Sequence, residues 1–143
     1  MSADPDGLER FLRGEIDPAA FPHREHVRMA FELLRRCNFA EAAWLYSRAL
    51  RCMSAKAGKP QAFHQTTTIA FLALIAERME RSGAADFAEL ERAYPEILDK
   101  TALARWYCAA QLASDIARRT FVLPELRLSA APPTPLRVGE SQK

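Results

Sequence analysis

The fold of this chain is decided by the stretch IAFLALIAERM at residues 69–79. Its apolar residues cover most of the circumference of a helix, which is typical of a helix surrounded by others. We expect this helix to begin between Gln61 and Thr66 and to run to about Ser82, because Gly83 is a common helix stop. The rest of the chain should supply the helices that cover it.

Amphipathic segments precede and follow this central helix. One of them has Val27, Ala30, Phe31 and Leu34 at the spacing of a single helical face. The expected segments are residues 5–14, 24–37, 39–56 and 86–94, then one from Asp99 or Thr101 through Ala110, and a last short turn from Ser114 to Arg119. The sequence therefore predicts an all-α, single-domain bundle of five to six helices over residues 1–126, with a flexible proline-rich tail at 127–143.

Composition limits the partners of the chain. Its 143 residues include 20 Lys and Arg against 18 Asp and Glu, a net charge of +2. So small an excess gives no reason to expect a nucleic acid or an anionic membrane as partner. No run of about twenty apolar residues could cross a bilayer. Three cysteines without CxxC spacing favour reduced thiols, and so a cytoplasmic location.

All three histidines lie at the starts of two of the expected helices. His23 and His26 belong to FPHREHVR at residues 21–28, and His64 belongs to FHQTTT at residues 63–68. His23 and His26 are one turn apart on one helical face, and His64 begins an apolar face of its own helix. If these two helices are neighbours, the three imidazoles meet in one pocket between them.

Three interpretations of this cluster remain open. Three neutral imidazoles suit a divalent transition metal (Zn, Cu or Fe), with Glu125 or another carboxylate as fourth ligand, in a small-molecule oxidoreductase or hydrolase. Without a metal, His26 or His64 is the expected catalytic general base, and Arg118 holds a carboxylate of the substrate. In the third interpretation the protein is a non-catalytic binding or assembly module whose histidines only cap and pack.

Further residues are candidates for contact with the expected small-molecule ligand. The hydroxyl of Thr67 could bind that ligand or orient an imidazole. Arg28 is placed to contact an anionic ligand, although a solvated helix face explains it more simply. A homodimer is left open by the sequence. Aromatic residues at helical spacing are expected in the core rather than in a stacking platform, namely Trp44, Tyr46, Trp106 and Tyr107.

Three separated motifs together resemble a family of small bacterial helical proteins. They are FPHREHVRMA at residues 21–30, FHQTTT at 63–68, and SDIAR at 114–118 leading into FVLPEL at 121–126. The family pattern often has a glutamate where this chain has Gln65, and it ends in Pro-Asp-Leu where this chain has Glu125. The resemblance implies one site, without implying a reaction, made of His23, His26, His64, Thr67, Arg118 and Glu125.

Overall fold

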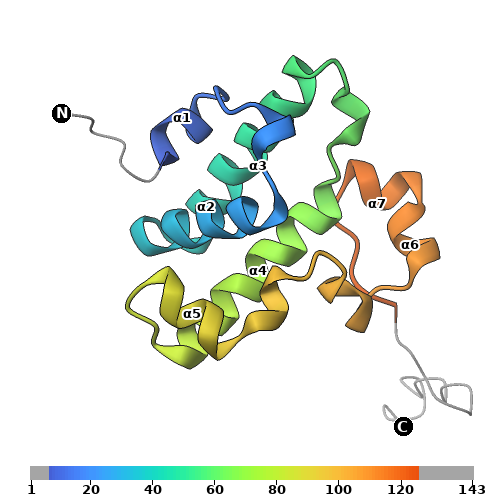
Figure 1. Cartoon of the computed structure of the whole chain (residues 1–143). Coiled ribbons are helices and arrows are strands. Elements are labelled where there is room, and N and C mark those ends of the chain that lie inside the picture. The colour runs from blue at the N-terminus through green and yellow to red at the C-terminus, as the bar shows by residue number, and fades with distance from the viewer. Residues whose placement is uncertain (1–6, 126–143) are drawn as a thin grey trace, which may run out of the picture.

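Helix α4 (Gln65–Ser82) runs through the middle of the fold, as its sequence predicts (Figure 1). It packs against α2 (His23–Arg36), α3 (Phe39–Lys56), α5 (Phe87–Ala93) and α7 (Asp115–Arg119). Its residues Leu72, Leu74 and Ile75 are buried. A helix with neighbours on several sides needs apolar residues on several sides, and this explains its broad apolar surface.

The computed structural model describes residues 7–125, and this part of the chain is all-α and contains no strand. The predicted start of the first helix at Asp4-Pro5 and the predicted proline-rich tail lie outside the described residues. Besides the helices named above, the described chain has two short α-helices, α1 (Leu8–Leu12) and α6 (Ala109–Ala113). Short 3-10 helices lie at Pro18–Ala20, Pro60–Ala62, Pro95–Leu98 and Ala102–Arg105.

Aromatic contacts join α1, α3 and the segment before α2 in the core. The ring of Phe11 stacks on Phe21 at 5.5 Å between centroids and lies 5.8 Å from the ring of Tyr46. The chain leaves α1 through Gly14, whose φ is +70°, a left-handed conformation that favours glycine. The Lys56 ammonium donates a hydrogen bond of 2.9 Å to the carbonyl of Gly14. These contacts hold α1 against α3.

Two helix starts are stabilised by their own side chains. Asn38 caps α3, because its side chain accepts from the Glu41 N–H while the Glu41 carboxylate accepts from the Asn38 N–H. At α5, Asp86 accepts from the Glu89 N–H. The Glu89 carboxylate accepts from the Ala85 N–H, one residue before the donor that a capping box would use. The sequence predicts the start of α5 correctly, whereas Asn38 is recognised as a cap only in the structure.

The predicted helix from Asp99 or Thr101 through Ala110 is wrong. The chain forms the 3-10 helix Ala102–Arg105, breaks at Tyr107, and starts again with α6, which Cys108 caps. Tyr107 is buried and its hydroxyl donates to the Val122 carbonyl at 2.8 Å. This contact with a distant segment is made at the break, so tertiary packing overrides the helical pattern here.

The expectation that four aromatic residues share the core holds for only two of them. Tyr46 and Tyr107 are buried, but Trp44 is 61% exposed and Trp106 is 36% exposed. The guanidinium of Arg48 lies over the Trp44 ring at 4.7 Å, and that of Arg105 lies over the Trp106 ring at 5.2 Å. In both tryptophans a guanidinium therefore lies over one ring face, where core side chains would pack if the ring were buried.

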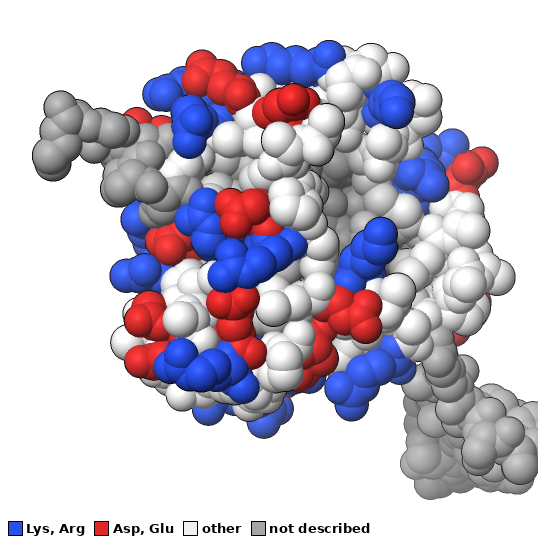
Figure 2. Space-filling view, viewed as in Figure 1, with Lys and Arg blue, Asp and Glu red and all other residues white. Residues whose placement is uncertain are grey.

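Charges of both signs are mixed over the face shown in Figure 2. Lys and Arg side chains lie beside Asp and Glu side chains there, and they do not gather into a patch of one sign. No helix within residues 7–125 is long and apolar enough to cross a membrane.

Candidate functional site

A cavity of about 680 Å³ opens between α2, α3 and the start of α4. Figure 2 shows the surface hollowed beside the start of α4. Part of the lining is apolar and comes from Leu50, Met53 and Phe63. The polar part of the lining includes Asp17, His26, Lys56, Lys59, His64, Thr67 and Thr68. Of the three predicted site histidines, this cavity brings together His26 and His64.

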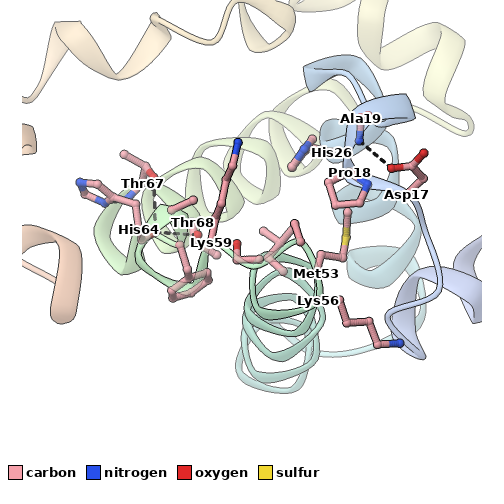
Figure 3. Close-up of a pocket in the computed structure, with 15 residues that line it drawn as sticks. Asp17, Pro18, Ala19, His26, Met53, Lys56, Lys59, His64, Thr67 and Thr68 are labelled. Atoms are coloured by element: carbon pink, nitrogen blue, oxygen red, sulfur yellow. Dashed lines mark hydrogen bonds between the residues drawn. The ribbon is translucent and has the colours of Figure 1, made fainter.

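His26 faces the cavity from α2 (Figure 3). Its ring lies 4.5 Å from the Phe21 ring and 6.5 Å from the His23 ring. Burial lowers the pKa of His26 from its ordinary 6.5 to about 4, and the nearby His23 lowers it further, while a hydrogen bond with the Phe21 backbone opposes the shift. His26 is therefore a neutral imidazole at pH 7.

His64 is engaged on both sides of its ring. Its Nδ1 accepts from the Thr67 N–H at 3.1 Å, so His64 is the N-cap of α4. Its Nε2 lies 2.7 Å from the Leu112 carbonyl, and because a carbonyl only accepts, Nε2 carries the proton. The ring points away from the other lining residues in Figure 3. His64 thus ties the start of α4 to α6.

His23 lines a smaller cavity of about 250 Å³, which it shares with His26, Thr67 and Lys100. Its Nε2 donates to the Ile97 carbonyl at 3.1 Å, and its ring meets the edge of Phe71 at 4.9 Å between centroids. Desolvation by burial is the largest cause that lowers the pKa of His23, although the bond to Ile97 opposes it. His26 is the histidine common to both cavities.

The other predicted site residues are spread over several places. Thr67 lines the cavity, and its hydroxyl donates to the His64 carbonyl at 3.3 Å. Arg28 pairs with Glu25 at 2.7 Å and lines a separate cavity beside α1. Arg118 donates to the Gln61 carbonyl at 2.9 Å. Glu125 is exposed and its backbone N–H donates to the Gln111 side chain at 3.3 Å.

The predicted transition metal would require several of these side chains to turn. Within residues 7–125 no group of three or more His, Cys, Asp or Glu side chains is placed to hold a metal ion. To bind an ion, His64 would have to release one of its two hydrogen bonds, to the Thr67 N–H or to the Leu112 carbonyl. His23 would have to release its bond to Ile97 if it bound the ion through Nε2. Metal binding stays a prediction. Elemental analysis of untagged wild-type and His64→Ala protein tests it, since a bound ion should be lost with its ligand.

Two lysines of the cavity were not among the predicted site residues. Lys56 and Lys59 both line it, from the end of α3 and the turn that follows. Gly58-Lys59-Pro60 has the pattern of a helix stop, a glycine followed by proline, and this pattern by itself indicates no site at Lys59. A signal for the two lysines is present in the sequence. They are two cations within four positions at the end of a helix, and the chain leads from there directly into a histidine motif. No acidic side chain within residues 7–125 forms an ion pair with Lys59.

Comparison of the chain with protein-family models, with curated proteins and with solved structures finds no match. The function must therefore be argued from the geometry of the site.

Replacing His64 tests its structural role. We expect His64→Ala to lower the free energy of unfolding by about 2 kcal/mol, because the variant loses the N-cap of α4 and the bond to the Leu112 carbonyl. His64→Asn should lose only about 1 kcal/mol, since an asparagine oxygen can still accept from the Thr67 N–H. Urea denaturation measures both. Equal losses in the two variants would show that the cap contributes nothing.

Proposed function

We propose that the protein binds a small organic anion with an apolar body in the cavity beside His26. The observation that supports this most is the composition of the lining, in which Lys56 and Lys59 stand beside Leu50, Met53 and Phe63. Cavities that bind small molecules are mostly apolar and have a few polar groups that orient the ligand. The volume of about 680 Å³ falls within the usual range for such sites.

The charges of the lining favour an anion. The lysines Lys56 and Lys59 are opposed there by a single carboxylate, Asp17. That carboxylate already accepts from the Ala19 N–H at 3.0 Å, which holds it at the start of its own turn. A carboxylate of the ligand beside Lys59 would gain a charge-assisted hydrogen bond. The apolar part of the ligand would replace water along the side chains of Leu50, Met53 and Phe63.

Binding of a ligand in this cavity is better supported than a role for His26 as a catalytic general base. A base works best when its pKa lies near the working pH. Burial holds the pKa of His26 at about 4, so its neutral ring is a weak proton acceptor at pH 7. A neutral imidazole is nevertheless a good hydrogen-bond partner for a ligand, because it donates from one nitrogen and accepts at the other.

We further propose a reducing, cytoplasmic setting for this binding protein. Cys37, Cys52 and Cys108 are free thiols, and Cys108 is exposed to solvent. Exposed free thiols persist where the surroundings are reducing.

Hexanoate and hexan-1-ol form a matched pair of probes for the cavity, because they differ in charge and not in chain length. Imidazole Cε1–H signals in an NMR titration report on the site, since the chain has only 3 His. We expect hexanoate to shift the His26 signal and hexan-1-ol to shift it much less. Lys59→Gln should weaken hexanoate binding about three- to fivefold.

The variant Lys59→Arg is the matched control, because it keeps the positive charge and should keep the affinity for hexanoate. Equal effects of hexanoate and hexan-1-ol on the His26 signal would contradict the proposal. So would wild-type affinity in Lys59→Gln.

A further inference from the structure

A groove of about 520 Å³ lies between α3 and α4, outside the His26 cavity. Trp44, Arg48 and Arg51 line it from α3, where they are four and three residues apart and so share one helical face. Gln65 and Ile69, one turn apart on α4, line the other side. The groove therefore combines two cations with an aromatic and an aliphatic side chain.

Arg48 and Arg51 differ from the arginines of this protein that pair with carboxylates. Seven other arginines of the described chain form ion pairs with acidic side chains: Arg13, Arg24, Arg28, Arg35, Arg36, Arg78 and Arg81. Arg48 and Arg51 have no acidic partner within residues 7–125, and no acidic residue lines the groove. The groove thus holds two positive charges that the described chain does not neutralise.

Both guanidinium groups are held in place without a carboxylate. Arg48 lies over the Trp44 ring at 4.7 Å. Arg51 lies over the Phe63 ring at 4.8 Å and donates to the Gln65 side chain at 2.9 Å. Stacking of this kind orients a guanidinium and leaves N–H groups at its edge able to donate. The two arginines are therefore arranged in advance to receive carboxylates.

Trp44 supplies the apolar part of the same surface. It is 61% exposed, the largest apolar residue of the described chain with so much of its side chain in water. Tryptophan and arginine are enriched among the residues that contribute most to protein interfaces. Beside Trp44, Ala43 and Ile69 extend the apolar lining of the groove.

We propose that this groove docks an acidic segment of a partner protein. Carboxylates of the segment bind Arg48 and Arg51, and an apolar side chain of the segment packs against Trp44 and Ile69. We infer an acidic partner from charge complementarity, because the groove presents two unneutralised arginines and no acidic side chain.

A nucleic acid fits this groove less well. Tight binding to a nucleic acid uses many phosphate contacts, on the order of 6–10 in a typical complex. This groove offers two arginines, and the rest of its lining is neutral. One face of the Trp44 ring already carries Arg48, which leaves less of the ring for a base to stack on.

Trp44 fluorescence can measure the docking directly. The Trp106→Phe variant leaves Trp44 as the only tryptophan, because the chain has only 2 Trp, and excitation at the red edge of the absorption band avoids the tyrosines. The probes are a blocked synthetic hexapeptide with four glutamates around a central leucine and phenylalanine, the same peptide with lysines for the glutamates, and an eight-residue thymidine oligonucleotide. We expect the acidic peptide to change Trp44 emission saturably and the lysine peptide to leave it unchanged.

Variants assign the binding to the two arginines. Arg48→Gln and Arg51→Gln should each weaken binding of the acidic peptide about three- to tenfold. Higher salt should also weaken it, because the contact is ionic. Arg92→Gln is the matched control, since it removes one exposed arginine from α5 and should change nothing. Wild-type affinity in the Arg48→Gln, Arg51→Gln double variant, or tighter binding of the oligonucleotide than of the acidic peptide, would overturn the proposal.

Discussion

Gly14→Ala is expected to lower the free energy of unfolding by roughly 2–5 kcal/mol, as measured by urea denaturation. Two effects add. Gly14 has a φ of +70°, which costs an alanine about 1–2 kcal/mol. A Cβ at this position would also lie 2.5 Å from the Cys52 Sγ and 3.2 Å from the Cys52 Cβ, so the Cys52 side chain or the packing of α1 on α3 would have to shift. Crowding of that kind in a packed site costs about 1–3 kcal/mol.

Gly58 separates these two effects. Its φ of +74° is nearly the same, but no atom of the described chain lies within 4 Å of a Cβ built there. Gly58→Ala should therefore cost only the backbone part, about 1–2 kcal/mol. Adding Cys52→Ala to Gly14→Ala should recover much of the remaining loss, because it removes the sulfur. Similar losses in Gly14→Ala and Gly58→Ala would mean that α1 is not tightly packed on α3.

The stability of the protein is expected to fall by about 3 kcal/mol between pH 7 and pH 4 through His26 alone. The folded-state pKa of His26 is about 4, whereas an unfolded histidine titrates near 6.5. Between these two values the unfolded chain binds a proton that the folded chain does not. Protons therefore favour unfolding as the pH falls from about 6.5 to about 4. Urea denaturation at several pH values measures the slope.

His26→Gln is the control for this pH dependence, because glutamine does not titrate. The contributions of other titrating groups must be subtracted from the measured pH dependence of stability. Burial also lowers the pKa of His23, which adds loss of stability in the same direction. The hydrogen bond from Arg28 lowers the pKa of Glu25, so that contribution is lost at lower pH still. If wild type and His26→Gln lose the same stability between pH 7 and pH 5, His26 is not buried as a neutral ring.

The three histidines have different roles in the structure. His64 and His23 each hold two distant segments together through a ring nitrogen, whereas His26 faces a cavity that two lysines also line. Substitution of His64 is therefore expected to act on stability, and substitution of Lys59 on ligand binding. This separation allows the proposed anion site to be tested without damage to the fold.

Local sequence patterns predict most of the helices. The span of α3, Phe39–Lys56, is the predicted one, and α5 and α7 begin after the predicted caps Asp86 and Ser114. Caps and apolar periodicity act over a few residues, so they can be recognised in a single sequence. The helix expected from Asp99 to Ala110 does not form, because the Tyr107 hydroxyl donates to the carbonyl of Val122, a partner that no local pattern indicates.

The sequence by itself determined the helical class, the central position of α4, and the placement of every histidine at a helix start. Tertiary structure alone decided what each histidine does, because the partners are far away in the chain. His23 bonds Ile97, 74 residues on, and His64 bonds Leu112, 48 residues on. Whether a side chain caps, crosslinks or lines a cavity depends on which distant backbone groups reach it. Packing of the whole domain sets those positions, and helical periodicity does not encode them.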